Sequence, residues 1–337
     1  MTEAASLNGK SILEVEDLVV HYPISRGILG TLKRAPKLSV HAVEGVSFSL
    51  RRGEMLALVG ESGCGKTTTA QTVLRLLEPD AGVIRFHDED ISELPPRKLR
   101  SLRRRMQIIY QDPYESLDPR FRVRTTVEEP LVIHRLGSKE ERQADVDRAL
   151  RQAGLDPPDL FLDRYPHQLS GGQRQRVAIA ASLVLNPDVL VADEPVSMLD
   201  VSVRAGVLAI LSELRAQGLG ILMITHDLST AARFADRIAV MYLGRIVEEG
   251  TAEAVVNNPQ HPYTRALLSV VPKRDPRERT TPQILRGETP NPVRIPVGCR
   301  FHPRCPMAIP DCKEIDPELR RPAAATSPTH RAACIRV

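Results

Sequence analysis

The clearest chemical motif in the sequence is a glycine-rich run that ends in a lysine and two threonines. Its members are Gly60, Glu61, Ser62, Gly63, Cys64, Gly65, Lys66, Thr67 and Thr68. The glycines allow successive backbone N–H groups to turn toward phosphate oxygens, and a helix that follows would add the positive end of its dipole. Lys66 would supply charge for terminal phosphates, and Thr67 a hydroxyl for the Mg²⁺ of a nucleoside triphosphate. The alternative is a glycine-rich turn without a ligand, but the strand pattern before it and the helical pattern after it favour a phosphate loop. We expect the thiol of Cys64 to point away from the nucleotide and to fill a small packing space.

Two adjacent carboxylates, Asp193 and Glu194, end an apolar run at 189–193 that is typical of a buried parallel strand. Ligands gather at the carboxyl edge of such sheets. We therefore predict that Asp193 reaches Mg²⁺ and that Glu194 polarises an attacking water, because phosphoryl transfer asks the protein mainly for positioning and charge stabilisation. Alone, such a pair is more often a helix cap, but the phosphate loop in the same chain favours catalysis.

A second anion-binding helix start is predicted at LSGGQ, residues 169–173. Ser170 stands in the capping position, and Gly171 and Gly172 expose backbone donors ahead of Gln173. A helix cap without a ligand is the alternative for an isolated LSGGQ. Together with the phosphate loop and the two carboxylates, however, LSGGQ resembles the ATPase subunits of ABC transporters. The resemblance implies that Ser170–Gln173 of one subunit close on the ATP that the phosphate loop of another holds, so that the active species is a dimer.

The same resemblance assigns roles to three more residues. Gln111 matches a loop that touches Mg²⁺ and faces the transmembrane partner, and His226 matches the histidine that senses the terminal phosphate and supports the attacking water. Asp200 matches the residue that couples the two sites across the dimer. Met198 is a minor departure from the family pattern, because the residue at this position is usually small. The resemblance thus implies Glu194, His226 and Gln111 as catalytic residues, and Mg²⁺ bound by Thr67, Gln111 and Asp193.

The adenine ring is usually stacked in this family on an aromatic residue upstream of the phosphate loop. Tyr22 occupies that position by strand order, and His41 is the competitor. An insertion between Tyr22 and the next strand leaves both assignments open.

An α/β framework must position these residues. Strand patterns at 12–20, 46–50, 56–60, 189–193 and 220–226 alternate with helical patterns at 67–77 and 171–185. The stretch at about 94–165 is charged and mostly helical in pattern. The resemblance implies an ABC-ATPase nucleotide-binding domain over 1–255, with a P-loop core, an antiparallel β subdomain and that helical subdomain. Proline is frequent beyond residue 255, so we expect 256–337 to be a small, irregular C-terminal extension with short elements.

The extension carries its own resemblance. HPYTRALLSVVP at 261–272, followed by LRGETPNP and GCRFHPRCP, is similar to the C-terminal region of oligopeptide and dipeptide transporter ATPases, a branch that includes nickel importers. YQDPYESLDPR and VMYLGRIVEEG are more similar to the second of the two ATPases that these importers use. The resemblance therefore implies a heterodimer with a second ATPase subunit, two membrane-spanning permeases and an extracytoplasmic peptide-binding protein.

Four cysteines stand in the extension at Cys299, Cys305, Cys312 and Cys334. Four soft ligands can close a tetrahedral zinc site or hold a four-iron cluster. The gaps of five and six residues between the first three cysteines argue against a simple zinc ribbon, which favours two-residue gaps. Some family members are understood to carry a [4Fe-4S] cluster here. Zinc and unliganded thiols remain alternatives, and His302 and His330 are near enough in sequence to substitute as ligands.

Composition sets the remaining limits. The 337 residues are 42% hydrophobic and 26% charged, as in a folded globular protein, with a net charge of +4. No apolar run approaches the roughly 18 residues of a spanning helix, and the N-terminus lacks a signal-peptide core. We therefore expect a cytosolic chain. The resemblance implies that it lies at the cytoplasmic face of the inner membrane, bound through the permeases, and that it has no nucleic-acid partner. The rival function is a soluble ABC ATPase that acts on nucleic acid or ribosomes, and a subunit that binds ATP without cleaving it is a third. The cargo stays open between dipeptides, oligopeptides, glutathione-like thiols and nickel chelates.

Overall fold

The computed structural model describes residues 10–24, 38–112, 116–271, 282–285, 287–325 and 327–337. Contacts divide the chain into two compact units, each built from several segments. One comprises 1–14, 49–55 and 85–224, and the other comprises 15–48, 56–84 and 225–337. We call them the helical unit and the phosphate-loop unit and describe each by itself.

The helical unit contains three parallel strands. β6 (Met106–Ile109) pairs with β7 (Val189–Asp193), and β7 pairs with β8 (Gly220–Thr225). Every residue of β7 and β8 is buried, which explains why these strands read as continuous apolar runs. Strand β6 interrupts the stretch that the sequence predicted as mostly helical.

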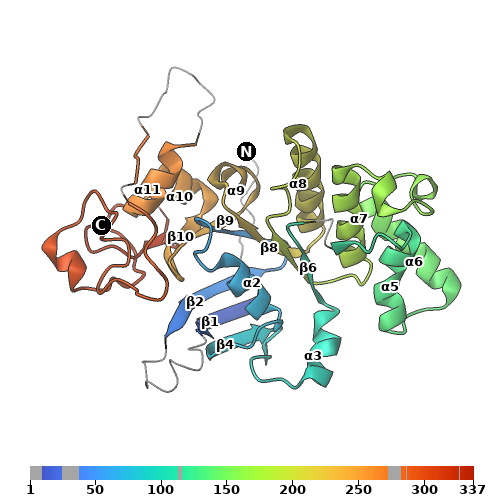
Figure 1. Ribbon diagram of the computed structural model, residues 1–337, viewed down its shortest axis with the longest axis horizontal. Coiled ribbons are helices and arrows are strands. Elements are labelled where there is room, and N and C mark those ends of the chain that lie inside the picture. The colour runs from blue at the N-terminus through green and yellow to red at the C-terminus, as the bar shows by residue number, and fades with distance from the viewer. Residues whose placement is uncertain (1–9, 25–37, 113–115, 272–281, 286, 326) are drawn as a thin grey trace. The chain divides into compact units, whose positions relative to one another are not determined.

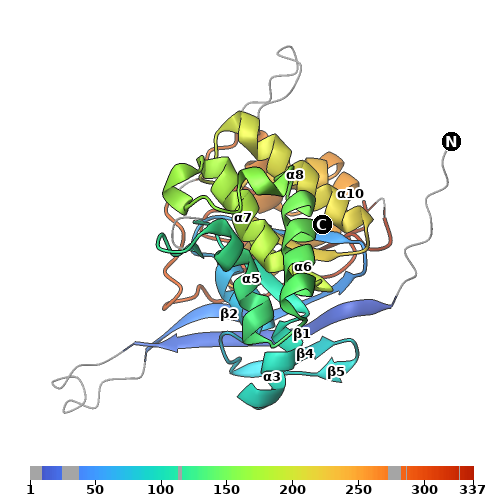
Figure 2. The same ribbon diagram turned by 90° about the vertical axis from the view of Figure 1, so that its right-hand side faces the viewer.

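Five helices belong to the described part of this unit. They are α3 (Pro96–Arg103), α5 (Val123–Ile133), α6 (Lys139–Gln152), α7 (Gly171–Leu183) and α8 (Val201–Ala216), with short 3₁₀ turns at Pro158–Leu160 and Pro166–Gln168. Helices α5, α6 and α7 pack against one another (Figure 2). Ser138 and Glu141 form a capping box that starts α6, as the serine before its charged first turn allows.

The phosphate-loop unit contains two groups of strands. β1 (Ser11–Pro23) lies between β2 (Ser39–Arg51) and β4 (Ala81–Phe86). The end of β4 pairs with β5 (Glu89–Asp90), and these paired residues belong to the helical unit. In the second group, β3 (Met55–Val59) is parallel to β9 (Arg237–Tyr242), and β9 is antiparallel to β10 (Arg245–Thr251). Helices α2 (Lys66–Val73) and α9 (Leu228–Phe234) follow β3 and β8 along the chain.

The C-terminal extension belongs to this second unit. Helix α10 (Ala252–Asn257) crosses its predicted start, and α11 (Pro262–Ser269) follows (Figure 1). The extension also contains a 3₁₀ turn at Pro310–Lys313 and β11 (Arg331–Ala332), which pairs with β10. The short elements agree with the proline-rich sequence. The boundary at residue 255 stays a prediction. No helix in the described part of the chain combines the length and the apolar character that a bilayer crossing requires.

Candidate nucleotide-binding site

The phosphate loop connects buried strand β3 to helix α2, as the sequence predicted. The ammonium of Lys66 is buried and donates to the carbonyls of Gly60 at 2.8 Å and Glu61 at 2.9 Å. Cys64 is 2% exposed, and burial raises the pKa of its thiol despite the nearby Lys66. The expectation that Cys64 packs in the interior is therefore confirmed.

Gly65 is required by the geometry of this turn. Its φ of +106° is one that other residues rarely adopt, and a Cβ would stand 2.2 Å from the carbonyl oxygen of Ala42. Gly65 is also the N-cap of α2 and provides no side-chain cap, which suits an anion-binding helix start.

Glu61, inside the phosphate loop, is held by residues of the C-terminal extension. Arg304 donates to both of its carboxylate oxygens, at 2.8 and 3.1 Å, and the Thr289 hydroxyl donates at 2.9 Å. The Tyr263 hydroxyl accepts from the backbone N–H of Glu61 at 3.0 Å. Burial alone would raise the pKa of Glu61, but the bonds from Arg304 and Thr289 outweigh it and the pKa is lowered. The sequence analysis did not identify these contacts.

The two candidates for the adenine side lie on neighbouring strands. Tyr22 is on β1 and 39% exposed, so its ring is accessible, and His41 is on β2. The ring of His41 lies 4.3 Å from that of His21, and both imidazoles bond to the same oxygen of Glu44. His41 is therefore engaged with its neighbours, which favours Tyr22 as the stacking residue.

His21, His41 and Glu44 could also be considered as metal ligands, since their ligand atoms lie within 4.8 Å of one another. The guanidinium of Arg300, however, lies 3.5 Å from Glu44. This fixed positive charge would repel a cation, and hydrogen bonding accounts for the cluster.

The predicted catalytic carboxylates lie in the helical unit, at the end of β7. Asp193 is buried at 5% exposure, and Glu194 follows it with a φ of +47°, a backbone conformation that is costly for a residue with a side chain. Its backbone N–H bonds to Ile224 at 2.9 Å. The amide of Gln111 donates to the Glu194 carboxylate at 3.1 Å. The structure thus brings two of the three predicted catalytic residues together.

LSGGQ begins α7, as predicted. Ser170 and Gln173 form a reciprocal capping box, with bonds of 3.2 and 3.0 Å. A Cβ on Gly172 would lie 2.3 Å from a methyl group of Val203, so only glycine permits this close approach to α8. Asp200, the N-cap of α8, and Met198 are both exposed, whereas Gly171 is partly exposed.

His226 belongs to the phosphate-loop unit, between β8 and α9, and is exposed. Asp227 beside it caps α9 by accepting from Ser229 at 2.9 Å. The predicted ATP residues are therefore divided. Lys66, Thr67 and His226 lie in one unit, and the Asp193–Glu194 pair lies in the other.

The four C-terminal cysteines are all free thiols within the phosphate-loop unit. Burial raises the pKa of Cys299 to about 11 and raises those of Cys305 and Cys334, and the neighbouring cysteines raise them further. The backbone N–H two residues after each of these three cysteines donates to its sulfur. The four residues thus form one neighbourhood.

The spacing of these sulfurs bears on which metal they fit. A tetrahedral zinc site has Zn–S bonds of about 2.3 Å, which place its sulfurs about 3.8 Å apart. Among the described residues, no three of the cysteine sulfurs lie within 4.8 Å of one another. Neither His302 nor His330 belongs to such a group of three ligand atoms among the described residues. Nε2 of His330 bonds to the buried Glu248 at 2.7 Å, and Nδ1 of His302 bonds to the carbonyl of Cys299 at 2.9 Å.

Family models match two segments of the chain. A model described as "ABC transporter" matches residues 43–197, and one described as "Oligopeptide/dipeptide transporter, C-terminal region" matches 247–312. The oligopeptide transport ATP-binding protein AppF of Bacillus subtilis is 46% identical over 97% of this chain and 98% of its own length. The dipeptide transport ATP-binding protein DppF of Escherichia coli is 44% identical over 95% and 93%.

Solved structures give the same likeness. A dimeric post-hydrolysis state of the ATP-binding cassette MJ0796 bound to ADP and Pi has a TM-score of 0.62 and 27% identity, over 71% of this chain and 98% of its own. The cbiO1 protein of Clostridium perfringens has a TM-score of 0.63 and 31% identity, over 74% and 91%. The α/β fold expected from the sequence is confirmed.

Proposed function

Because the chain belongs to the ABC transporter ATP-binding proteins that carry the oligopeptide/dipeptide transporter C-terminal region, we propose that it hydrolyses ATP to energise an importer of dipeptides or oligopeptides. ATP hydrolysis coupled to transport is the activity of this family. A soluble ATPase that acts on nucleic acid or ribosomes is not favoured, since the relatives over the whole chain are peptide-transport proteins.

The observation that carries the proposal is the geometry of the phosphate loop. Lys66 is buried within the turn, Gly65 has the positive φ that the turn requires, and α2 begins without a side-chain cap. These features suit the terminal phosphates of MgATP. Gly60, Ser62, Gly63, Cys64 and Thr68 would contribute backbone or side-chain contacts, and Tyr22 would stack on adenine.

Gln111, Asp193 and Glu194 of the helical unit would act in hydrolysis together with Thr67 and His226. Oxygen atoms of Thr67, Gln111 and Asp193 suit Mg²⁺, which prefers hard oxygen ligands. Glu194 would accept a hydrogen bond from the attacking water and polarise it, and the 3.1 Å bond from Gln111 would orient that carboxylate. His226 would support the same water.

The signature helix would act in a dimer. Ser170, Gly171, Gly172 and Gln173 would close on the nucleotide of a partner subunit, and exposed Asp200 would couple the two sites. We propose a heterodimer with a second, homologous ATPase subunit. This pair would bind two permeases at the cytoplasmic face of the inner membrane, and an extracytoplasmic binding protein would deliver the cargo.

Substitution of the proposed base tests the enzymatic part. Glu194→Gln keeps the shape of the side chain but removes its charge, so MgATP binding should persist while turnover in the assembled complex falls by about a hundredfold or more. Glu213→Gln, on an exposed face of α8, is the matched control and should retain turnover. Turnover near the wild-type rate in Glu194→Gln would refute the assignment of the base.

We propose that the four cysteines hold a [4Fe-4S] cluster rather than one tetrahedral zinc ion; the absence, among the described residues, of three cysteine sulfurs within 4.8 Å of one another supports this choice. Such a cluster would supply a cross-link between Cys299, Cys305, Cys312 and Cys334. Metal and acid-labile sulfide analysis of anaerobically purified chain, beside its Cys305→Ser variant, tests this assignment. Iron with matching sulfide supports it, whereas zinc alone or no metal contradicts it.

A further inference from the structure

Two arginines lie inside the gap between the first two C-terminal cysteines. Arg300 directly follows Cys299, and Arg304 directly precedes Cys305. We call residues 299–305 the arginine loop. Each arginine forms an ion pair with an acidic residue of the same unit. Arg304 contacts the phosphate loop directly, and Arg300 contacts strand β2.

Arg304 contacts the phosphate side. Its side chain is 8% exposed, and its two-pronged bond to Glu61 joins residues 243 positions apart in sequence. A planar guanidinium bonded to both carboxylate oxygens fixes orientation as well as distance. Because Glu61 immediately follows Gly60 in the phosphate loop, a displacement of Arg304 would displace backbone donors of that loop.

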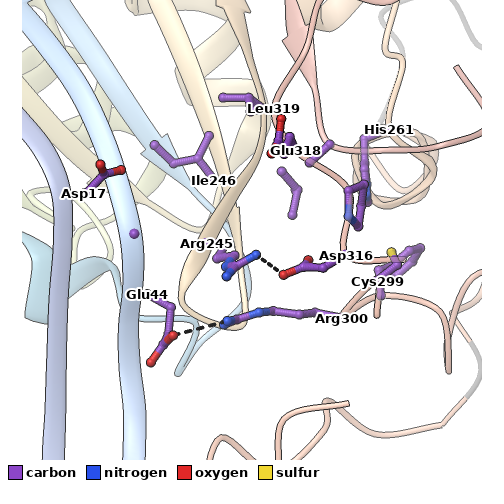
Figure 3. Close-up of a pocket in the computed structure, with 15 residues that line it drawn as sticks. Asp17, Glu44, Arg245, Ile246, His261, Cys299, Arg300, Asp316, Glu318 and Leu319 are labelled. Carbon is purple, nitrogen blue, oxygen red and sulfur yellow. Dashed lines mark hydrogen bonds and ion pairs between the residues drawn. The ribbon is translucent and has the colours of Figure 1, made fainter. Parts of the chain in front are cut away.

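Arg300 contacts β2, the strand that carries His41. Its side chain is also 8% exposed, and it reaches from the arginine loop to Glu44 on β2 at 3.5 Å (Figure 3). Its second anchor is the carbonyl of Leu243, at 2.6 Å. Through Glu44 it is connected to His21, the neighbour of Tyr22. Arg300 borders a cavity of about 320 Å³ that Cys299 also lines.

Aromatic side chains pack the arginine loop against the rest of its unit. Phe301, within the loop, is 1% exposed, and its ring lies 5.2 Å from Tyr242 and 5.4 Å from Tyr263. Tyr263 in turn accepts the bond from the backbone of Glu61. Tightly packed side chains transmit displacement because interiors have few voids to absorb it.

We propose that Arg300 and Arg304 are positioning residues that couple the four-cysteine region to the ATP site. The coupling is reciprocal, as linkage requires: a change at the cysteines alters MgATP affinity, and MgATP alters the order of the arginine loop. The proposal rests on the proposed function, since it requires that the phosphate loop binds MgATP. It assigns a role to the C-terminal region that does not depend on which metal, if any, the cysteines hold.

A double-mutant cycle on the full chain tests the coupling. The dissociation constant of a fluorescent ATP analogue with Mg²⁺ is measured for wild type, Arg304→Ala, Cys305→Ser and the double variant. We expect each single change to weaken binding about tenfold, which corresponds to about 1.4 kcal/mol. The double variant should bind no more weakly than Arg304→Ala, because both changes act through one connection. Effects that multiply in the double variant, or an unchanged constant in Arg304→Ala, would overturn the proposal.

Two controls separate positioning from loss of folding. Arg304→Lys keeps the positive charge but cannot bond to both carboxylate oxygens of Glu61 as the planar guanidinium does. It should give a dissociation constant between those of wild type and Arg304→Ala, with a wild-type circular dichroism spectrum. Arg320→Ala removes an exposed arginine from the same region and should bind like wild type. Arg304→Ala could weaken binding only because the unit unfolds. In that case the circular dichroism spectrum of Arg304→Ala will differ from that of wild type, and Arg304→Lys will bind like wild type. This pair of results would show that the proposal is wrong.

The reciprocal effect is measured by hydrogen exchange with mass spectrometry. MgATP should slow exchange of the backbone amides of residues 299–305 by about threefold or more in wild type and not in Arg304→Ala. Unchanged exchange in a chain that binds MgATP would refute the coupling alone. A wild-type chain that binds no MgATP would instead contradict the proposed function and the coupling together.

Discussion

His261 makes the stability of the C-terminal region sensitive to mild acid. Its ring is 1% exposed, and its Nδ1 caps α11 by accepting from the backbone N–H of Tyr263 at 3.1 Å. Only an unprotonated nitrogen can accept this bond. Burial lowers the pKa of His261 from 6.5 to about 4, although the nearby Glu248 carboxylate opposes the shift.

The direction of the effect follows from these values. Below about pH 6.5 the unfolded chain takes up a proton that the folded chain does not bind until about pH 4, so stability falls as the pH falls through this window. Between about pH 7.5 and pH 5 the loss from this one group is about 2 kcal/mol.

The substitution His261→Asn isolates this contribution. Asparagine retains a side-chain oxygen for the cap but does not titrate, so the difference in unfolding free energy between about pH 7.5 and pH 5 should shrink by about 2 kcal/mol. Urea unfolding followed by circular dichroism measures it. Thr251→Asn exchanges one non-titrating cap for another at α10 and should leave the pH difference as in wild type. If His261→Asn keeps the full wild-type difference, a neutral, buried imidazole is the wrong description.

Three further substitutions follow from the geometry. Gly65→Ala should reduce MgATP affinity by about a hundredfold in equilibrium binding, because the new Cβ would stand 2.2 Å from the carbonyl oxygen of Ala42 in a backbone conformation with φ of +106°. An affinity within twofold of wild type would contradict this loop geometry. Tyr22→Ala should raise the dissociation constant of MgATP about tenfold, by fluorescence titration, and His41→Ala should change it less; the opposite order would assign the adenine contact to His41. Glu248→Ala should lower the free energy of unfolding, measured by urea unfolding, by about 3 kcal/mol. The substitution leaves the N–H groups of Gln260 and His261 and the ring of His330 without their acceptor. A loss under about 1 kcal/mol would mean that these groups find other partners.

Local sequence patterns were sufficient to predict the central strands and the starts of α2 and α7. Strands β3, β7 and β8 are buried on both faces, so their sequences are continuous apolar runs that stand out from their surroundings. The start of α7 was equally clear, because the Ser170 capping box depends on residues only three positions apart.

Strand β6 was not predicted because its signal is not local. It has only four residues and follows the arginine-rich end of α3. Its pairing with β7 decides its conformation, and that pairing joins positions more than eighty residues apart, as in Ile109 and Ala192.

The contacts of the C-terminal extension were also beyond sequence reasoning. The arginines were visible within GCRFHPRCP, but nothing local indicates that Arg304 reaches Glu61 or that Arg300 reaches Glu44. His330 was considered as a metal ligand, yet it bonds to Glu248, a fully buried carboxylate that needs donors. Such partners are chosen by tertiary packing.

Peptide uptake by the reconstituted importer tests the central claim most directly. Proteoliposomes that contain this chain, the proposed second ATPase and the two proposed permeases would be supplied with ATP on the side of the ATPases. The proposed binding protein and a labelled dipeptide or oligopeptide would be supplied on the other side. We predict accumulation of peptide that requires ATP and stops when Glu194→Gln replaces the wild-type chain. Uptake at the wild-type rate with that variant would contradict the assignment of Glu194 as the base in the ATP hydrolysis that energises transport. A complex that hydrolyses ATP but moves none of a broad set of peptides would contradict peptide import.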